Sequence, residues 1–219
     1  MSLPECFCWT RFGTEAGQSA EQILARKDEE RIANNGFFFW GIGNAIGPSI
    51  TELVRLVENP EVLFSPIQSK PRREDVSPAL VVTWSEATTL AGDEFSLSKR
   101  SLVTSRLDPI SPRDVHYALV CYSGCSLLGS VSEVKIRFGQ LRNLLTKRQV
   151  GASQVTAVVQ HDEKARETGP AYNVSLRAAL VAPYFIRLRK PIPLPTAHQQ
   201  QDWDREVYLL WQQRATGSH

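Results

Sequence analysis

A run of four aromatic residues at positions 37–40, with sequence FFFW, constrains this chain more than any other feature. Four consecutive aromatic side chains cannot all face water, so the run predicts a short buried strand. The next eight residues, 41–48, contain three glycines and end in a proline. Glycines favour a turn, and proline suits the first turn of a helix. The segment therefore predicts a strand, a glycine turn and a helix, in that order.

Three interpretations of this segment compete. Glycines between a strand and a helix let backbone N–H groups approach a phosphate, although the spacing of Gly41, Gly43 and Gly47 is one residue too long for the dinucleotide fingerprint. The aromatic side chains can instead fill the core while the glycines only permit a tight turn. In the third interpretation Trp40 stacks on a flat ring, and the backbone of residues 41–43 reads the edge of that ring. Such stacking is worth about 1–3 kcal/mol per base.

Along the whole chain, periodicity predicts four helices, the one after the glycine turn included, and a series of strands. An alternating strand is expected at 5–11, a helix from Ser19 to Gly36, and an amphipathic helix at 49–58. Runs rich in β-branched and aromatic residues predict strands at 62–67, 79–85, 101–105, 115–122, 134–138, 154–160 and 174–188. A short helix at 140–145, an extended arm at 189–197 and a last helix at 198–214 complete the expectation.

Helices at the two ends and strands in the middle predict an α+β fold. We expect a mixed β-sheet, partly closed into a β-barrel, with flanking helices. Apolar residues make up 42% of the 219 residues, enough for a sizeable core, and we expect one domain over residues 1–216. Its core is expected at 5–160, with a strand-rich extension and the C-terminal helix at 170–216. The last residues, 217–219, are typical of a tag remnant.

The sequence predicts an intracellular protein in the cytoplasm. No stretch approaches the roughly 18 apolar residues of a membrane helix, and the first residues lack the layout of a signal peptide. The four cysteines could form a metal site, but the C-x-C spacing of Cys6 and Cys8 fits structural zinc poorly. We therefore expect free, mostly buried thiols, and neither a metal nor another cofactor.

The order of strand, helix, Trp-Gly turn, second helix and sheet resembles the PUA-like superfamily, especially its EVE and YTH branches. The elements that carry the resemblance are Trp40-Gly41, the nearby Asn44 and the helix from Ser49, within residues 5–160. The resemblance implies a small barrel-like domain that binds a modified base of DNA or RNA in an aromatic cage. Carried onto this chain, it implies base-binding residues at Trp40, Gly41, Ile42, Gly43, Asn44, Trp84 and Ser65.

Basic residues gather in several loops and strand ends. The net charge of +2 is too small to indicate a nucleic-acid partner by itself, so the distribution matters more. Each cluster can be an ordinary solvated loop; if two or three meet around a pocket, they form a phosphate footprint. The residues expected to contact phosphate are Arg72, Arg73, Arg106, Arg142 and Lys147.

Signals for catalysis are weak. The chain has no G-x-S-x-G and no H-E-x-x-H motif. If the protein is an enzyme, we expect a nuclease or amidohydrolase reaction on a nucleotide or small amide, with His116 or Glu86 near the same pocket. A third alternative is a protein-interaction subunit that uses Trp203 and Trp211 of the last helix. The expectation is a module that binds nucleic acid through one modified or flipped base.

Overall fold

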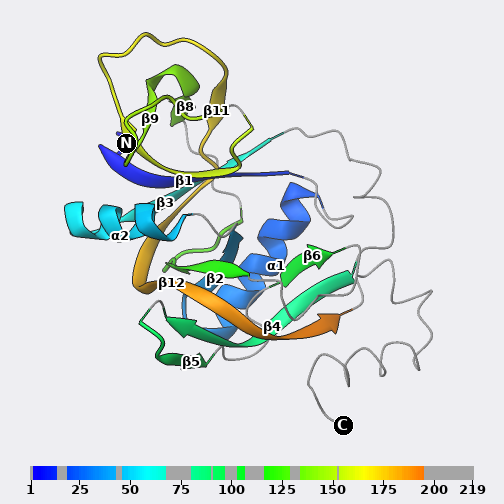
Figure 1. Cartoon of the computed structure of the whole chain (residues 1–219). Coiled ribbons are helices and arrows are strands. Elements are labelled where there is room, and N and C mark those ends of the chain that lie inside the picture. The colour runs from blue at the N-terminus through cyan, green and yellow to red at the C-terminus, as the bar shows by residue number, and fades with distance from the viewer. Residues whose placement is uncertain are drawn as a thin grey trace.

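The computed structural model describes residues 2–13, 19–42, 46–67, 80–89, 91–96, 103–106, 116–128, 134–151 and 153–194. For residues 80–85, 95–96, 103–106 and 190–194 it describes the backbone alone. Two α-helices and twelve strands lie within these ranges (Figure 1). In chain order the elements are β1 (Cys6–Phe12), α1 (Ala20–Ala33), β2 (Phe37–Ile42), α2 (Gly47–Leu56), β3 (Glu61–Pro66), β4 (Leu80–Thr89), β5 (Glu94–Ser96), β6 (Val103–Arg106), β7 (Tyr117–Tyr122), β8 (Lys135–Arg137), the 3-10 turn η1 (Phe138–Gln140), β9 (Leu141–Asn143), β10 (Thr156–His161), β11 (Ala171–Asn173) and β12 (Leu176–Leu194).

One mixed sheet organises the chain. Its strands follow the order β2-β7-β12-β3-β1-β10-β9, and β4, which carries β5 and β6, also pairs with β12. The β1–β3 pair is parallel, and the other pairs are antiparallel. A second sheet joins β11 and β8. The predicted α+β class with a mixed sheet is confirmed, but the described strands do not close into a barrel, because β2 and β9 at the two ends of the order do not pair.

Local signals explain both helices. Ser19 caps α1 by accepting a hydrogen bond from the Gln22 backbone N–H, and the Gln22 side chain accepts one from the Ser19 N–H in return. Pro48 lies in the first turn of α2, where its missing N–H costs nothing. The helix ends before Asn59-Pro60, as predicted. Within the described ranges, neither helix is long and apolar enough to pass through a membrane.

Side chains alternate between the two faces of each strand, so the core consists of separate apolar clusters on either face of the sheet. On β2, Phe38 and Trp40 enter the largest apolar cluster, while Phe39 enters another on the opposite face. On β1, Cys8 faces the largest cluster, and Trp9 belongs to a third that lies towards β10. The central strands β1 and β3 are therefore apolar on both faces.

One local prediction is wrong, and another is incomplete. The expected helix at 140–145 is instead η1 followed by β9, because residues 141–143 pair with β10 in the sheet. The expected arm at 189–197 is in large part strand, because β12 continues to Leu194 along β4. The expected helix at 198–214 and the terminal residues 217–219 lie outside the described residues.

Candidate functional site

Trp40 is the last buried residue of β2 and lies among aromatic rings. Its ring centroid lies 4.6 Å from that of Phe64, at an interplanar angle of 67°, and 5.5 Å from that of Phe12, at 75°. Both contacts have edge geometry, which aromatic pairs prefer over a flat sandwich. Trp40 is 8% exposed, so its ring belongs mainly to the core and only a small part reaches solvent.

Two further rings lie on the same face of the sheet. Ile42 pairs with Tyr117 of β7, and Leu119 of β7 pairs with Phe185 of β12, so their side chains share the Trp40 face. The rings of Tyr117 and Phe185 are stacked, with centroids 5.0 Å apart and planes 12° apart. Tyr117 is half-buried. We call the rings of Phe12, Trp40, Phe64, Tyr117 and Phe185 the aromatic corner.

Gly47 brings the start of α2 against the aromatic corner. A Cβ atom added at this glycine would lie 3.2 Å from Cε1 of Phe185, closer than ordinary contact. The N-cap residue Ile46 provides no side-chain hydrogen bond, so the helix begins without a polar cap. The glycine therefore permits close packing of the helix end on Phe185.

Of the predicted base-binding residues that the structure describes, Gly41 and Ile42 lie beside Trp40 and Ser65 does not. Gly41 and Ile42 follow Trp40 in β2 and are half-buried. Ser65 is fully buried, accepts a hydrogen bond from Trp9 Nε1 at 3.0 Å and lies on the β3 face opposite Phe64, away from the aromatic corner. The backbone of Trp84 lies in β4 opposite Pro191, but its side chain is outside the described set. Gly43 and Asn44 lie entirely outside the described residues.

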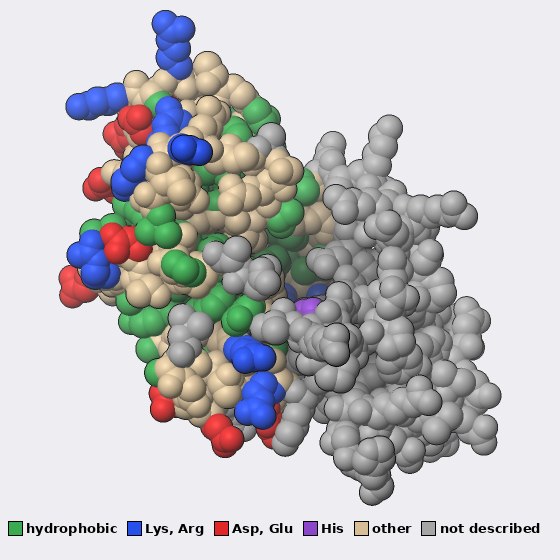
Figure 2. All heavy atoms as spheres, in the orientation of Figure 1, with side chains coloured by type: hydrophobic (Ala, Val, Ile, Leu, Met, Phe, Trp, Pro, Cys, Tyr) green, Lys and Arg blue, Asp and Glu red, His purple; other side chains and the backbone are tan. Residues whose placement is uncertain are grey.

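Of the five predicted phosphate contacts, the two with described side chains, Arg142 and Lys147, do not lie beside Trp40. The Arg142 guanidinium donates to the carbonyls of Gly139 and Leu141 at 2.8 and 3.2 Å, and exposed Lys147 donates to Gln160 at 3.2 Å. Both lie with β9, at the opposite end of the strand order from β2. Figure 2 shows Lys and Arg side chains gathered over the end of the molecule that carries β8, β9 and β11. Arg72, Arg73 and the Arg106 side chain lie outside the described set.

Arg187 is a basic residue beside the aromatic corner that sequence reasoning did not select. It is exposed, pairs with Tyr117 across β7 and β12, and lies on the same face as Phe185. Within the described part of the chain its guanidinium has no hydrogen-bond or ion-pair partner. The alternation of buried Ile186 and Leu188 with exposed cations could have indicated this face, but only the strand pairing shows that it adjoins Tyr117.

A buried ion pair lies along the edge of β2 that faces away from β7. Lys27 and Glu30 are 3% and 7% exposed, and Lys27 Nζ donates to Glu30 Oε2 at 2.6 Å. Both also bind the backbone of Phe39: its N–H donates to Glu30 Oε1 at 2.8 Å, and its carbonyl accepts from Lys27 Nζ. Burial raises the pKa of Glu30 to about 7 and lowers the pKa of Lys27.

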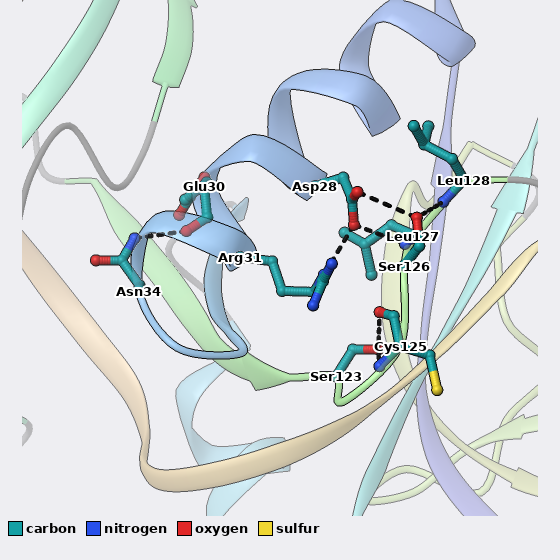
Figure 3. A network of polar contacts seen from close by, with 9 residues as sticks. All are labelled: Asp28, Glu30, Arg31, Asn34, Ser123, Cys125, Ser126, Leu127 and Leu128. Carbon is teal, nitrogen blue, oxygen red and sulfur yellow. Dashed lines mark hydrogen bonds and ion pairs between the residues drawn. The ribbon is translucent and has the colours of Figure 1, made fainter.

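Asp28 fixes the same helix to the loop after β7 (Figure 3). Its carboxylate accepts hydrogen bonds from Arg31 Nε and the Leu127 N–H, both at 2.8 Å, and from Ser126 Oγ at 3.1 Å. Burial raises the pKa of Asp28, but these hydrogen bonds outweigh it and hold the pKa below its usual value. Asn34 Nδ2 also donates to the Glu30 carbonyl at 2.7 Å near the helix end. Helix α1 is therefore held on two sides.

Among the described residues, the cysteines and histidines do not form a reactive cluster. The prediction of mostly buried, free thiols is confirmed, since Cys6, Cys8 and Cys121 are buried and Cys125 is exposed. Burial raises the pKa of Cys8 to about 12 and that of Cys121 well above its usual value, which keeps both thiols protonated and inert. Among the residues with described side chains, no three His, Cys, Asp or Glu residues gather as metal ligands.

Comparisons with protein-family models, curated proteins and solved structures find no match to this chain.

Proposed function

We propose that this chain is a nucleic-acid binding module that holds one modified or flipped base at the aromatic corner. The observation that carries the proposal is the position of Trp40: it ends the buried part of β2, two rings meet it with edge geometry, and half-buried backbone follows it at once. We also propose a PUA-like fold, on the basis of the mixed sheet and the Trp-Gly step that precedes α2.

The exposure of Trp40 sets a condition on how a base is bound. At 8% exposure the indole cannot stack on a guest without a local rearrangement of its neighbours. Half-buried Ile42 and Tyr117 are the neighbours on the same face that can move at least cost. Stacking gains about 1–3 kcal/mol per base, which is enough to offset a few rotamer changes but not the loss of a strand.

The backbone of Gly41 is suited to read the edge of the base. The N–H and C=O groups of Phe39 point away from β7, because Glu30 and Lys27 bind them. Backbone groups along a strand alternate in direction, so those of Gly41, two residues later, also point outward. The absence of a Cβ at Gly41 lets a planar ring approach this backbone closely.

Arg187 supplies charge for a phosphate at the same place. It is exposed and adjoins Tyr117, so a nucleotide whose base enters the aromatic corner can place its phosphate near the guanidinium.

The test is equilibrium binding to a panel of short fluorescein-labelled oligonucleotides. The panel contains single-stranded RNA, single-stranded DNA and duplex DNA, each with one central methylated adenine, one methylated cytosine or neither. We expect one member to bind best, and Trp40→Leu to weaken that binding about five- to 150-fold, the equivalent of one lost stacking contact.

The control is Phe37→Leu, which removes an aromatic ring from the exposed start of the same strand. It should bind as the wild type does. Thermal unfolding of each variant separates lost binding from lost folding, and Tyr117→Leu provides a second change at the aromatic corner. Wild-type affinity in a folded Trp40→Leu variant, or no binding to any oligonucleotide by the wild type, would contradict the proposal.

A further inference from the structure

Strand β2 has a polar edge that no neighbouring strand covers among the described residues. It ends the strand order, with β7 as its partner on one side. The outward N–H and C=O of Phe39 therefore require partners other than a strand, because unpaired backbone groups away from water are costly.

Helix α1 supplies those partners from two residues on one face. Glu30 accepts the Phe39 N–H, Lys27 donates to the Phe39 carbonyl, and the two side chains bind each other at 2.6 Å. The Glu30 carboxylate and the Lys27 ammonium thus take the places of the C=O acceptor and the N–H donor that a neighbouring strand would offer to Phe39.

The chemistry of the pair points to a role in specifying geometry. Taking two charges out of water costs more free energy than burying two apolar side chains of similar size, so buried ion pairs contribute little to net stability. Apolar residues at these positions would leave Phe39 without partners and would allow β2 to shift along β7. A shift of one residue would turn Trp40 to the opposite face of the sheet.

We propose that Lys27 and Glu30 are positioning residues for the base-binding site. They fix the backbone one residue before Trp40, and so set the direction of its indole and of the outward backbone groups of Gly41. The role of this pair in base binding rests on the proposed function. Its role in fixing the position of Trp40 can be tested without any ligand.

The anchoring of α1 makes the pair an effective constraint. Asp28, between the two residues in sequence, binds the loop after β7 through Ser126 and the Leu127 N–H (Figure 3). The helix is therefore attached to both strands of the β2–β7 pair, to β2 through Phe39 and to β7 through its following loop. Movement of β2 relative to β7 must break one of these attachments.

The first test uses fluorine NMR on protein labelled with fluorotryptophan. The Trp40 resonance is assigned among the five tryptophans by its loss in Trp40→Leu. We expect Glu30→Ala to shift or broaden the Trp40 resonance while that of Trp9, on β1, stays unchanged. The double variant Lys27→Met with Glu30→Gln should restore it, because one neutral amide can accept from the Phe39 N–H and donate to its carbonyl.

The matched control is Glu52→Ala, which removes an ion pair of the same i,i+3 spacing from the exposed side of α2. It should leave the Trp40 resonance unchanged. An unchanged Trp40 resonance in folded Glu30→Ala would overturn the proposal. If Glu30→Ala does not fold, hydrogen exchange in the wild type decides: the Phe39 amide should be protected, and exchange at the rate of an unstructured amide would overturn the proposal.

Binding then separates this inference from the proposed function. With the oligonucleotide of the panel that binds the wild type best, Glu30→Ala should weaken binding about tenfold, and the double variant should recover most of the loss. Weaker oligonucleotide binding by Glu30→Ala, without a change in the Trp40 resonance, would overturn the positioning role. A changed Trp40 resonance in a chain that binds no oligonucleotide would support the fixing of Trp40 and overturn the proposed function.

Discussion

Gly36 shows how one residue determines the path from α1 into β2. Its φ angle is +98°, in the region that favours glycine, and a Cβ atom added there would overlap the ring of Tyr122. Its N–H donates to the Arg31 carbonyl at 2.8 Å, which closes the end of the helix. The direction in which β2 leaves the helix, and with it the placement of Trp40, begins at this glycine.

We therefore expect Gly36→Ala to be strongly destabilising. Gly92 is the matched control, since its φ angle of +96° is almost the same and an added Cβ there would meet nothing within 4 Å. The backbone strain alone should cost about 1–2 kcal/mol in both variants, and the overlap with Tyr122 should add to the loss in Gly36→Ala only. Urea unfolding measures both free energies. Equal losses would show that the Tyr122 contact does not constrain the turn.

At the scale of elements, the pair formed by Lys27 and Glu30 predicts a pH dependence. Burial raises the pKa of Glu30 from 4.5 to about 7. Between these values the folded chain holds a proton that the unfolded chain has released, so the free energy of unfolding should fall as pH rises through this window. The slope for one such proton is at most about 1.4 kcal/mol per pH unit.

Comparison with Glu30→Gln isolates this contribution. The variant lacks the titrating carboxyl. The unfolding free energy of the wild type minus that of the variant should therefore decrease as pH rises from 4.5 towards 7. Chemical unfolding at several pH values gives both curves. Parallel curves across the window would mean that Glu30 titrates as an ordinary exposed carboxyl does.

Elements whose signals are local were predictable from the sequence. The cap at Ser19, Pro48 in the first turn of α2, and the aromatic run of β2 all act within a few residues, and each element lies within a few residues of its predicted position. The predicted helix at 140–145 failed because sheet pairing with β10, a non-local effect, overrides local preference. Likewise, Lys27 and Glu30 resemble solvated helix charges until α1 is packed on β2.

At the scale of the whole molecule, strand order decides which residues share a site. The sequence could indicate Trp40, but Tyr117 and Phe185 join it only through the pairing of β2, β7 and β12. The same pairing places Arg187 beside the aromatic corner and leaves Arg142 and Lys147 with β9. Sequence distance carries no information of this kind, so the basic residue beside the aromatic corner could not be chosen from charge clusters alone.

The placement of the charges predicts how binding responds to salt. Arg187→Glu should weaken oligonucleotide binding and lower the slope of log affinity against log salt by about 1, as expected for the loss of one phosphate contact. Lys147→Glu makes the same charge change at the β9 end and should have the smaller effect. Titrations at several salt concentrations compare the two. A larger effect of Lys147→Glu would place the phosphate path over β8 and β9 instead.

The central claim is that a planar base reaches the ring of Trp40. Intermolecular nuclear Overhauser effects between the protons of the bound base and the indole protons of Trp40, measured on the saturated complex with the best oligonucleotide, test this claim most directly. The account predicts such effects at Trp40 and at Tyr117, and none at Trp9 on the opposite face of β1. Effects confined to other residues, with none at Trp40 under saturation, would contradict it.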